Sequence, residues 1–168
     1  TCGMTQESQP QRPPFKVAGN ATIKHLNVRK EGPEDDKILA VDIKLEMCRL
    51  DRRLCGYFDD ALEAFLWRDE SESLVVRNLY LEPLKFGNDI EGVTVKIGDD
   101  EFLGCRVSKF AISPRDGGVI DLVVSVSAYP SSRDVSELAT RVHADVPVSH
   151  EAQPDLFSSE QETTGEAA

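Results

Sequence analysis

The sequence predicts a mainly β fold, either an antiparallel β-sandwich or a partly open β-barrel, with one or two short helices. Two observations support this prediction. Apolar and polar side chains alternate along residues 38–47, which is the pattern of a half-buried strand. Short polar turns separate successive segments of this kind, and no strand–helix–strand rhythm accompanies them. The sequence leaves the choice between sandwich and barrel open.

The first two strands are expected to form a hairpin. Residues 15–29 alternate with one break in phase before Leu26, and residues 38–47 alternate without a break. Between them, residues 31–36 combine Gly, Pro and four acidic side chains, a composition typical of a turn. The two strands should therefore pair directly.

Three further strands follow in the second half of the chain. Residues 93–97 and 102–112 flank a Gly-Asp-Asp sequence, which predicts a second hairpin. A loop at residues 113–118 contains Pro and two adjacent glycines. After it, residues 119–129 alternate again and predict a long strand.

Two short helices are expected. Residues 59–67 begin with two aspartates, which suit the positive end of a helix dipole. Residues 132–142 begin with a serine that can cap the helix, and Val135, Leu138 and Val142 share one face. Neither segment is long enough to change the β classification.

The two ends of the chain are expected to be disordered. Residues 1–14 are polar and contain three prolines, and residues 145–168 contain six acidic side chains and no Lys or Arg. Such segments bury too little apolar surface to offset the entropy lost on ordering. The predicted organisation is a lead-in at 1–14, a β-rich domain at 15–144 and an acidic tail at 145–168.

Composition excludes several functional classes. The 168 residues carry a net charge of -11, which is wrong for a broadly basic nucleic-acid-binding protein, although a local basic face is still compatible with it. No apolar run reaches the roughly 20 residues of a membrane helix, and the first residues have no signal-peptide core. We therefore expect a cytoplasmic protein with no membrane partner.

Catalytic signals are weak. His25, His143 and His150 stand at no metal-ligand spacing from each other or from a cysteine, and the four cysteines contain no CxxC pair. No nucleophile or phosphate-binding motif is present in the sequence. We expect no enzyme activity, no cofactor and no metal site; an unrecognised site built from Asp and Glu is the enzymatic alternative.

Basic residues near the first hairpin are the candidates for nucleic-acid binding. Aromatic residues follow them closely in the sequence, and basic plus aromatic side chains on a β surface can hold single-stranded DNA. A core role for the aromatics and simple solvation of the basic side chains is the alternative. The candidates are Lys24, Arg29, Lys30, Arg49, Arg52 and Arg53.

The most specific motif lies in the acidic tail. Gln153, Asp155, Leu156 and Phe157 match four positions of the pentapeptide Gln-x-Asp/Ser-Leu-Phe, with Pro154 at the position that is usually aliphatic. This segment resembles the peptide by which bacterial replication and repair proteins bind the sliding clamp. The resemblance implies that Leu156 and Phe157 are apolar anchors and that Gln153 forms hydrogen bonds at a neighbouring subsite.

The body has a second resemblance. Residues 23–37 look like small, mostly uncharacterised proteins of phage and prophage early regions. Together the two resemblances imply a non-enzymatic accessory protein of DNA replication, recombination or repair, tethered to the clamp, whose body binds single-stranded DNA or a replication or defence protein. The alternative is an acidic phage inhibitor that blocks a host DNA-binding protein or the clamp itself. Exposed strand edges would also allow a homodimer.

Overall fold

Nine strands and three short α-helices make up residues 15–152, the part of the chain that the computed structural model describes. The elements in chain order are β1 (Lys16–Glu31), β2 (Ile38–Asp51), the 3-10 helix η1 (Arg52–Leu54), α1 (Cys55–Phe58), α2 (Leu62–Leu66), β3 (Trp67–Glu70), β4 (Ser73–Val76), β5 (Leu84–Phe86), β6 (Ile90–Ile97), β7 (Asp100–Arg115), β8 (Val119–Ala128), α3 (Ser132–Thr140) and β9 (Asp145–Ala152). The mainly β prediction is confirmed.

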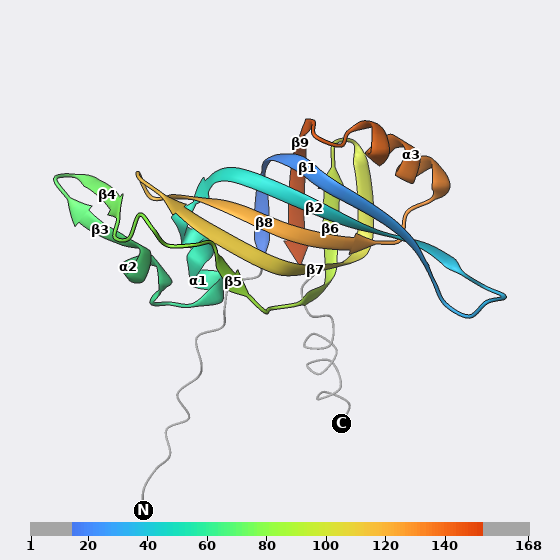
Figure 1. The fold of residues 1–168 in the computed structure, drawn as a ribbon, viewed down its shortest axis with the longest axis horizontal. Helices are drawn as coiled ribbons and strands as arrows, with labels where there is room; N and C mark the ends of the chain where they lie inside the picture. Colours follow the sequence, from blue (N-terminus) through green and yellow to red (C-terminus); the bar gives the residue numbers. More distant parts are fainter. Residues whose placement is uncertain (1–14, 153–168) are drawn as a thin grey trace, which may run out of the picture.

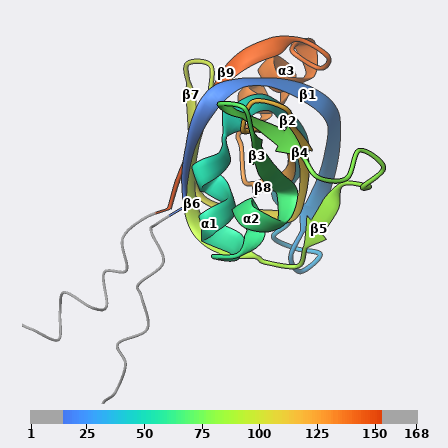
Figure 2. The ribbon, with the colours of Figure 1, turned by 90° about the vertical axis from the view of Figure 1, so that its left-hand side faces the viewer.

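Six of the strands close into a ring, so the fold is a partly closed antiparallel barrel. The hydrogen-bonded order is β7-β6-β9-β1-β2-β8, and β8 pairs back onto β7. β7 is long enough to pair with three neighbouring strands. Its first half pairs with β6, and its second half pairs with β5 on one side and β8 on the other. Figure 2 looks into this ring from one end.

The predicted β1–β2 hairpin is confirmed, and its turn is closed by a hydrogen bond from Asp36 N to Pro33 O of 2.9 Å. The break in phase along β1 is a β-bulge, because the register shifts between Ile23 and His25. The extra residue at the bulge reverses the phase of the alternation along β1. Beyond the bulge, His25 is exposed on the outside of the barrel.

The acidic tail does not begin where we expected. Residues Asp145–Ala152 form β9, which pairs with β1 on one side and β6 on the other. Val146, Val148 and His150 point inward and are buried, so the segment alternates as a strand despite its polar composition. Pro147 lacks an N–H, but its carbonyl accepts a hydrogen bond from Gly98 N at 2.8 Å. The boundary of the folded domain therefore lies beyond residue 144.

The barrel interior is apolar, and α1 closes one end of it (Figure 2). Phe58 of α1 packs edge-on against Phe110 of β7, with 5.1 Å between ring centroids, and Phe110 also meets Phe15 at 5.5 Å. These rings are buried together with inward-facing aliphatic side chains from all six strands of the ring.

The helix expected over residues 59–67 is shorter than predicted. It spans only Leu62–Leu66, and Trp67 begins the β3–β4 hairpin, with its indole N–H donating to Arg115 O at 2.9 Å. Figure 1 shows this hairpin and α2 at one end of the molecule and the tip of the β1–β2 hairpin at the other. The outer faces of β2, β8 and β7 lie between these ends and carry the candidate site.

The helix expected over residues 132–142 is present as α3 but ends at Thr140, so Val142 lies outside it, and the capping serine is Ser131 rather than Ser132. Its N-terminus is a capping box, in which the Ser131 hydroxyl accepts from Asp134 N and the Asp134 carboxylate accepts from Ser131 N, each at 3.2 Å. Leu138 is buried beneath the helix.

Candidate nucleic-acid interface

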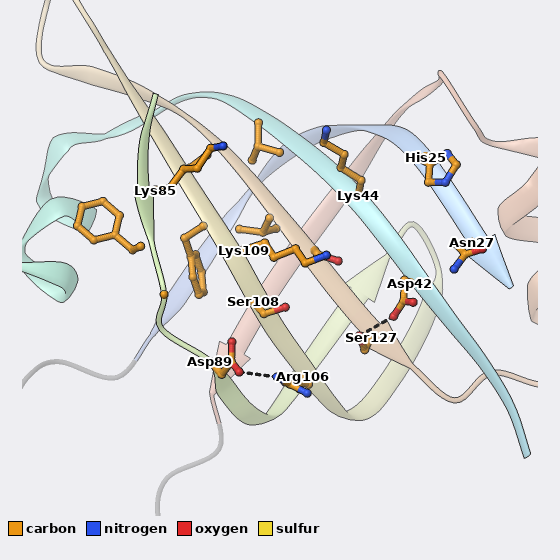
Figure 3. Close-up of a pocket in the computed structure, with 17 residues that line it drawn as sticks. His25, Asn27, Asp42, Lys44, Lys85, Asp89, Arg106, Ser108, Lys109 and Ser127 are labelled. Carbon is orange, nitrogen blue, oxygen red and sulfur yellow. Dashed lines mark hydrogen bonds and ion pairs between the residues drawn. The ribbon is translucent and has the colours of Figure 1, made fainter. Parts of the chain in front are cut away.

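A groove of about 860 Å³ crosses the outer face of the barrel (Figure 3). It runs over β1, β2, β8, β7 and β5. Its lining includes three lysines and one arginine, two aspartates and several serine hydroxyl groups. Outer faces of barrels are usually convex, so the depth of this groove needs a local cause. The side chains along its floor provide one.

The floor is built from small hydroxyl side chains. Lys44 of β2 stands opposite Ser125 of β8, and Ser125 stands opposite Ser108 of β7. Serines leave a depression between neighbours with long side chains, because each contributes only one heavy atom beyond Cβ. His25 faces Lys44 from β1 and ends this row at the groove margin.

A second row runs beside the first. Asp42 of β2 stands opposite Ser127 of β8, and Ser127 stands opposite Arg106 of β7. Ser127 Oγ donates to Asp42 Oδ1 at 2.7 Å. At the far end of the row Arg106 forms an ion pair with Asp89, which Figure 3 shows at one mouth of the groove. This row therefore places the hydroxyl group of Ser127 between two charged side chains, each of which has an ion-pair partner.

A β-bulge in β7 adds a third lysine to the groove. The register of β7 against β8 shifts between Ser108 and Ala111, and Lys109 takes the left-handed conformation with φ of 55°. The bulge leaves Phe110 pointing into the core while Lys109 is exposed on the groove side. The next row continues from Ala111 to Lys85 of β5. Lys85 and Lys109 thus approach from one wall and Lys44 from the other.

The three lysines carry charge that residues 15–152 do not neutralise. Within residues 15–152, Lys44, Lys85 and Lys109 form no ion pair, and all three are exposed. The two aspartates of the groove are already engaged with arginines. A positive groove in a chain with a net charge of -11 is a local reversal of the overall field.

Asp42 is held in its charged form. Arg29 Nε donates to Asp42 Oδ2 at 2.8 Å, and a second guanidinium nitrogen donates to Oδ1 at 3.2 Å. The hydrogen bond from Arg29 lowers the pKa of Asp42 below its usual range, partial burial opposes this shift, and the hydroxyl of Ser127 adds to it. The Asp42 carboxylate is therefore held by Arg29 and does not compete with a bound ligand for the groove lysines.

One aromatic ring is within reach of a ligand in the groove. Phe86 of β5 lines it and is half-buried, and its ring stacks on Phe58 with 4.6 Å between centroids. Phe58 is part of the core, so the orientation of Phe86 is fixed from behind. A fixed aromatic beside lysines is a suitable surface for an unpaired base.

The structure separates the basic residues predicted from sequence into two groups. Lys24, Arg29 and Lys30 lie on the second half of β1, whereas Arg49 lies near the far end of β2 and Arg52 and Arg53 lie in η1 after it. Leu39 pairs with Lys30, and ten residues of strand separate Leu39 from Arg49, which corresponds to roughly 30 Å. The six predicted residues therefore form no single patch.

Several of these predicted residues are engaged with acidic neighbours. Lys24 Nζ lies 3.3 Å from Glu46, Arg52 Nε lies 3.9 Å from Glu63, and Arg29 contacts Asp42. Only Arg29 borders the groove, through Asp42. Whether any of the six binds nucleic acid stays a prediction.

A group of carboxylates elsewhere in the structure was not expected. One oxygen each from Asp100, Asp134 and Glu137 lie within 4.8 Å of one another. Asp134 caps α3, and Glu137 lies 3.6 Å from Arg133. These contacts account for Asp134 and Glu137, whereas Oδ2 of Asp100 is buried without a hydrogen-bond partner among residues 15–152.

The predicted clamp-binding residues Gln153, Asp155, Leu156 and Phe157 lie outside the described residues. Among residues 15–152, no helix has both the length and the apolar character that crossing a bilayer requires. Comparisons with protein-family models, curated proteins and solved structures found no match to this chain.

Proposed function

We propose that this chain is a non-enzymatic phage or bacterial accessory protein of DNA replication, recombination or repair, whose barrel binds single-stranded DNA in the groove. The observation that carries the proposal is a set of three lysines, Lys44, Lys85 and Lys109, which have no ion-pair partner in the described part of this acidic protein and surround a floor of serines. Lysines attract phosphates by charge, and serine hydroxyls donate to phosphate oxygens.

The shape of the groove favours a single strand over a duplex. A single strand can place its phosphates against the lysines while a base meets Phe86. No helix or ribbon projects from this face to enter a DNA groove, as far as residues 15–152 are concerned. Sequence-tolerant binding with a strong dependence on salt is the expected behaviour.

The second part of the proposal is the tether. The segment Gln153–Phe157 would bind the sliding clamp and keep the barrel close to DNA. β9 ends at Ala152, so the motif begins one residue after the last described strand. Tethering raises the local concentration of the barrel near DNA without a rigid interface.

The experiment for the groove compares two variants with equal loss of charge. We expect K44Q/K85Q/K109Q to weaken binding of a fluorescein-labelled oligothymidylate by roughly tenfold or more, measured by anisotropy at low salt. The control R49Q/R52Q/R53Q removes the same charge at the other end of β2 and should change the affinity less than about threefold. Equal effects of the two variants, or no binding by the parent protein, would contradict the proposed groove.

The clamp tether has its own test. A labelled peptide of residues 153–162 should bind a bacterial sliding clamp saturably, and the L156A/F157A peptide should not, because the apolar anchors carry most of the energy. If both peptides are inert, the tether is wrong. If the clamp binds but DNA does not, the inhibitor alternative replaces the accessory role.

A further inference from the structure

The groove has a second candidate ligand within the same chain. Residues 153–168 contain four acidic side chains and no Lys or Arg, and three of the acids, Glu160, Glu162 and Glu166, follow the predicted clamp motif. The groove offers three lysines without an ion-pair partner in the described part of the chain. The two sets of charges are equal in number and opposite in sign.

The last described strand ends close to the groove. Ala152 of β9 pairs with Val93 of β6, and Val93 pairs with Cys105 of β7. Cys105 is the neighbour of Arg106, which lines the groove and, in Figure 3, lies at one mouth with Asp89. Two strand spacings therefore separate the end of β9 from the row of Arg106, a distance of about 10 Å.

The segment after Ala152 is long enough to cross the groove. Seven residues, 153–159, link Ala152 to Glu160, and an extended chain covers up to about 3.4 Å per residue. The groove spans three strand spacings from β7 through β8 and β2 to β1, which is roughly 15 Å. Glu160, Glu162 and Glu166 can thus reach the lysines on both walls without disturbing the barrel.

We propose that the acidic segment from Ser158 onward occupies this groove in the free protein and competes there with single-stranded DNA. The inference rests on the proposed function for the identity of the competitor, but not for the contact between segment and groove. A segment attached about 10 Å away acts at a millimolar effective concentration, which exceeds the protein concentration of ordinary assays. Binding of the segment to the groove of its own chain is therefore favoured over binding to the groove of a second copy.

The contact would couple DNA binding to clamp binding. The acids lie directly after Leu156 and Phe157, so a groove-bound segment restrains the clamp motif beside the barrel. DNA that displaces the acids would release the motif, and by thermodynamic linkage the clamp would favour DNA binding by the same factor. The full chain should therefore engage the clamp better when DNA is present.

The test uses the full chain with matched changes in charge. The variant E160Q/E162Q/E166Q leaves the clamp motif intact, and the control D69N/E70Q/E72Q removes three exposed acids from the β3–β4 hairpin. We expect the first variant to bind the oligothymidylate three- to tenfold more tightly than the parent at low salt, and the control to differ less than twofold. Equal gains in the two variants would mean a general effect of net charge and would overturn the inference.

A measurement without DNA separates this inference from the proposed function. Amide resonances of Lys44, Ser108, Ser125 and Ser127 should differ between the parent and E160Q/E162Q/E166Q in ¹H–¹⁵N spectra, and they should not differ between the parent and the control. Such differences support the contact even if no DNA binds. Identical spectra overturn the contact, and the proposed function is then judged by the lysine variants alone.

Discussion

The two faces of β2 and β8 have opposite properties although they belong to the same strands. The inward face consists of fully buried aliphatic side chains, such as Leu45 and Val124, whereas the outward face consists of Lys44 and Ser125 with their neighbours. Adjacent residues point to opposite sides of a strand, so a single segment supplies both the core and the groove. Stability and ligand binding should therefore respond to different, alternating residues.

The largest expected effect lies on the inward face. Leu45 has no exposed surface, and L45A should lower the free energy of unfolding by about 2–5 kcal/mol, because it removes buried methyl groups and leaves a cavity. Chemical denaturation measures the loss. The neighbouring K44A should stay within about 0.5 kcal/mol of the parent. A comparable loss in K44A would break the distinction between the two faces.

The next largest effect on the free energy of unfolding comes from His150, a polar side chain in the barrel interior. His150 is fully buried, neither ring nitrogen has a hydrogen-bond partner within residues 15–152, and burial lowers its pKa to about 4. Below pH 6.5 the unfolded chain binds a proton that the folded chain excludes, so stability falls as the pH drops from about 6.5 to about 4. The total loss attributable to His150 should be about 3 kcal/mol.

The variant H150L isolates this contribution. Its free energy of unfolding, measured against pH, should lack the part of the acid sensitivity that His150 causes. The carboxylates of the chain still titrate in both proteins. A parent and a variant with parallel pH profiles between pH 4 and 6.5 would show that His150 is not protonated on unfolding in the way we describe.

A smaller effect tests whether the groove works by shape as well as charge. S108L/S125L fills the floor and leaves every charge in place, so it should weaken oligothymidylate binding by roughly fivefold, a change of about 1 kcal/mol. The free energy of unfolding should change little, because both serines face outward. Unchanged affinity would mean that the lysines act without the groove between them.

The smallest effect concerns the paired aspartate of the groove. D42N removes a partly exposed ion pair with Arg29 and should cost about 0.5–1 kcal/mol at pH 7. Because the pKa of Asp42 is lowered, the ion pair stabilises the protein at neutral pH and is lost as the pH falls below the usual aspartate range. The difference between D42N and the parent should therefore shrink in acid; a constant difference would argue against this cause.

Local patterns were sufficient for the regular parts of the fold. The β1–β2 and β6–β7 hairpins follow from alternation and from turn residues, including Gly98 with a φ of 62°. β9 was missed because Ser149, His150 and Glu151 outweigh Val146 and Val148 in composition, although the alternation is present. Ring closure also needs the β2–β8, β1–β9 and β6–β9 pairings, which join residues distant in the sequence, and no local pattern encodes such contacts.

The candidate groove could not have been predicted from the sequence in the same way. Lys44, Lys85 and Lys109 are far apart in the chain, and they meet because β5, β7, β8 and β2 are neighbours in the ring. A bulge exposes Lys109, and bulges leave little trace in a single sequence. One local signal was available: the alternation of Val with Ser125 and Ser127 marks an outward face of small polar side chains.

The most direct test of DNA binding in the groove is to titrate the full-length, ¹⁵N-labelled protein with an oligothymidylate and to map the affected amides. We expect the shifts to concentrate on the residues of the groove floor and walls, namely Ser108, Lys109, Ser125, Ser127 and Lys44. Shifts concentrated on Arg49, Arg52 and Arg53, or no shifts at saturating oligonucleotide, would contradict it.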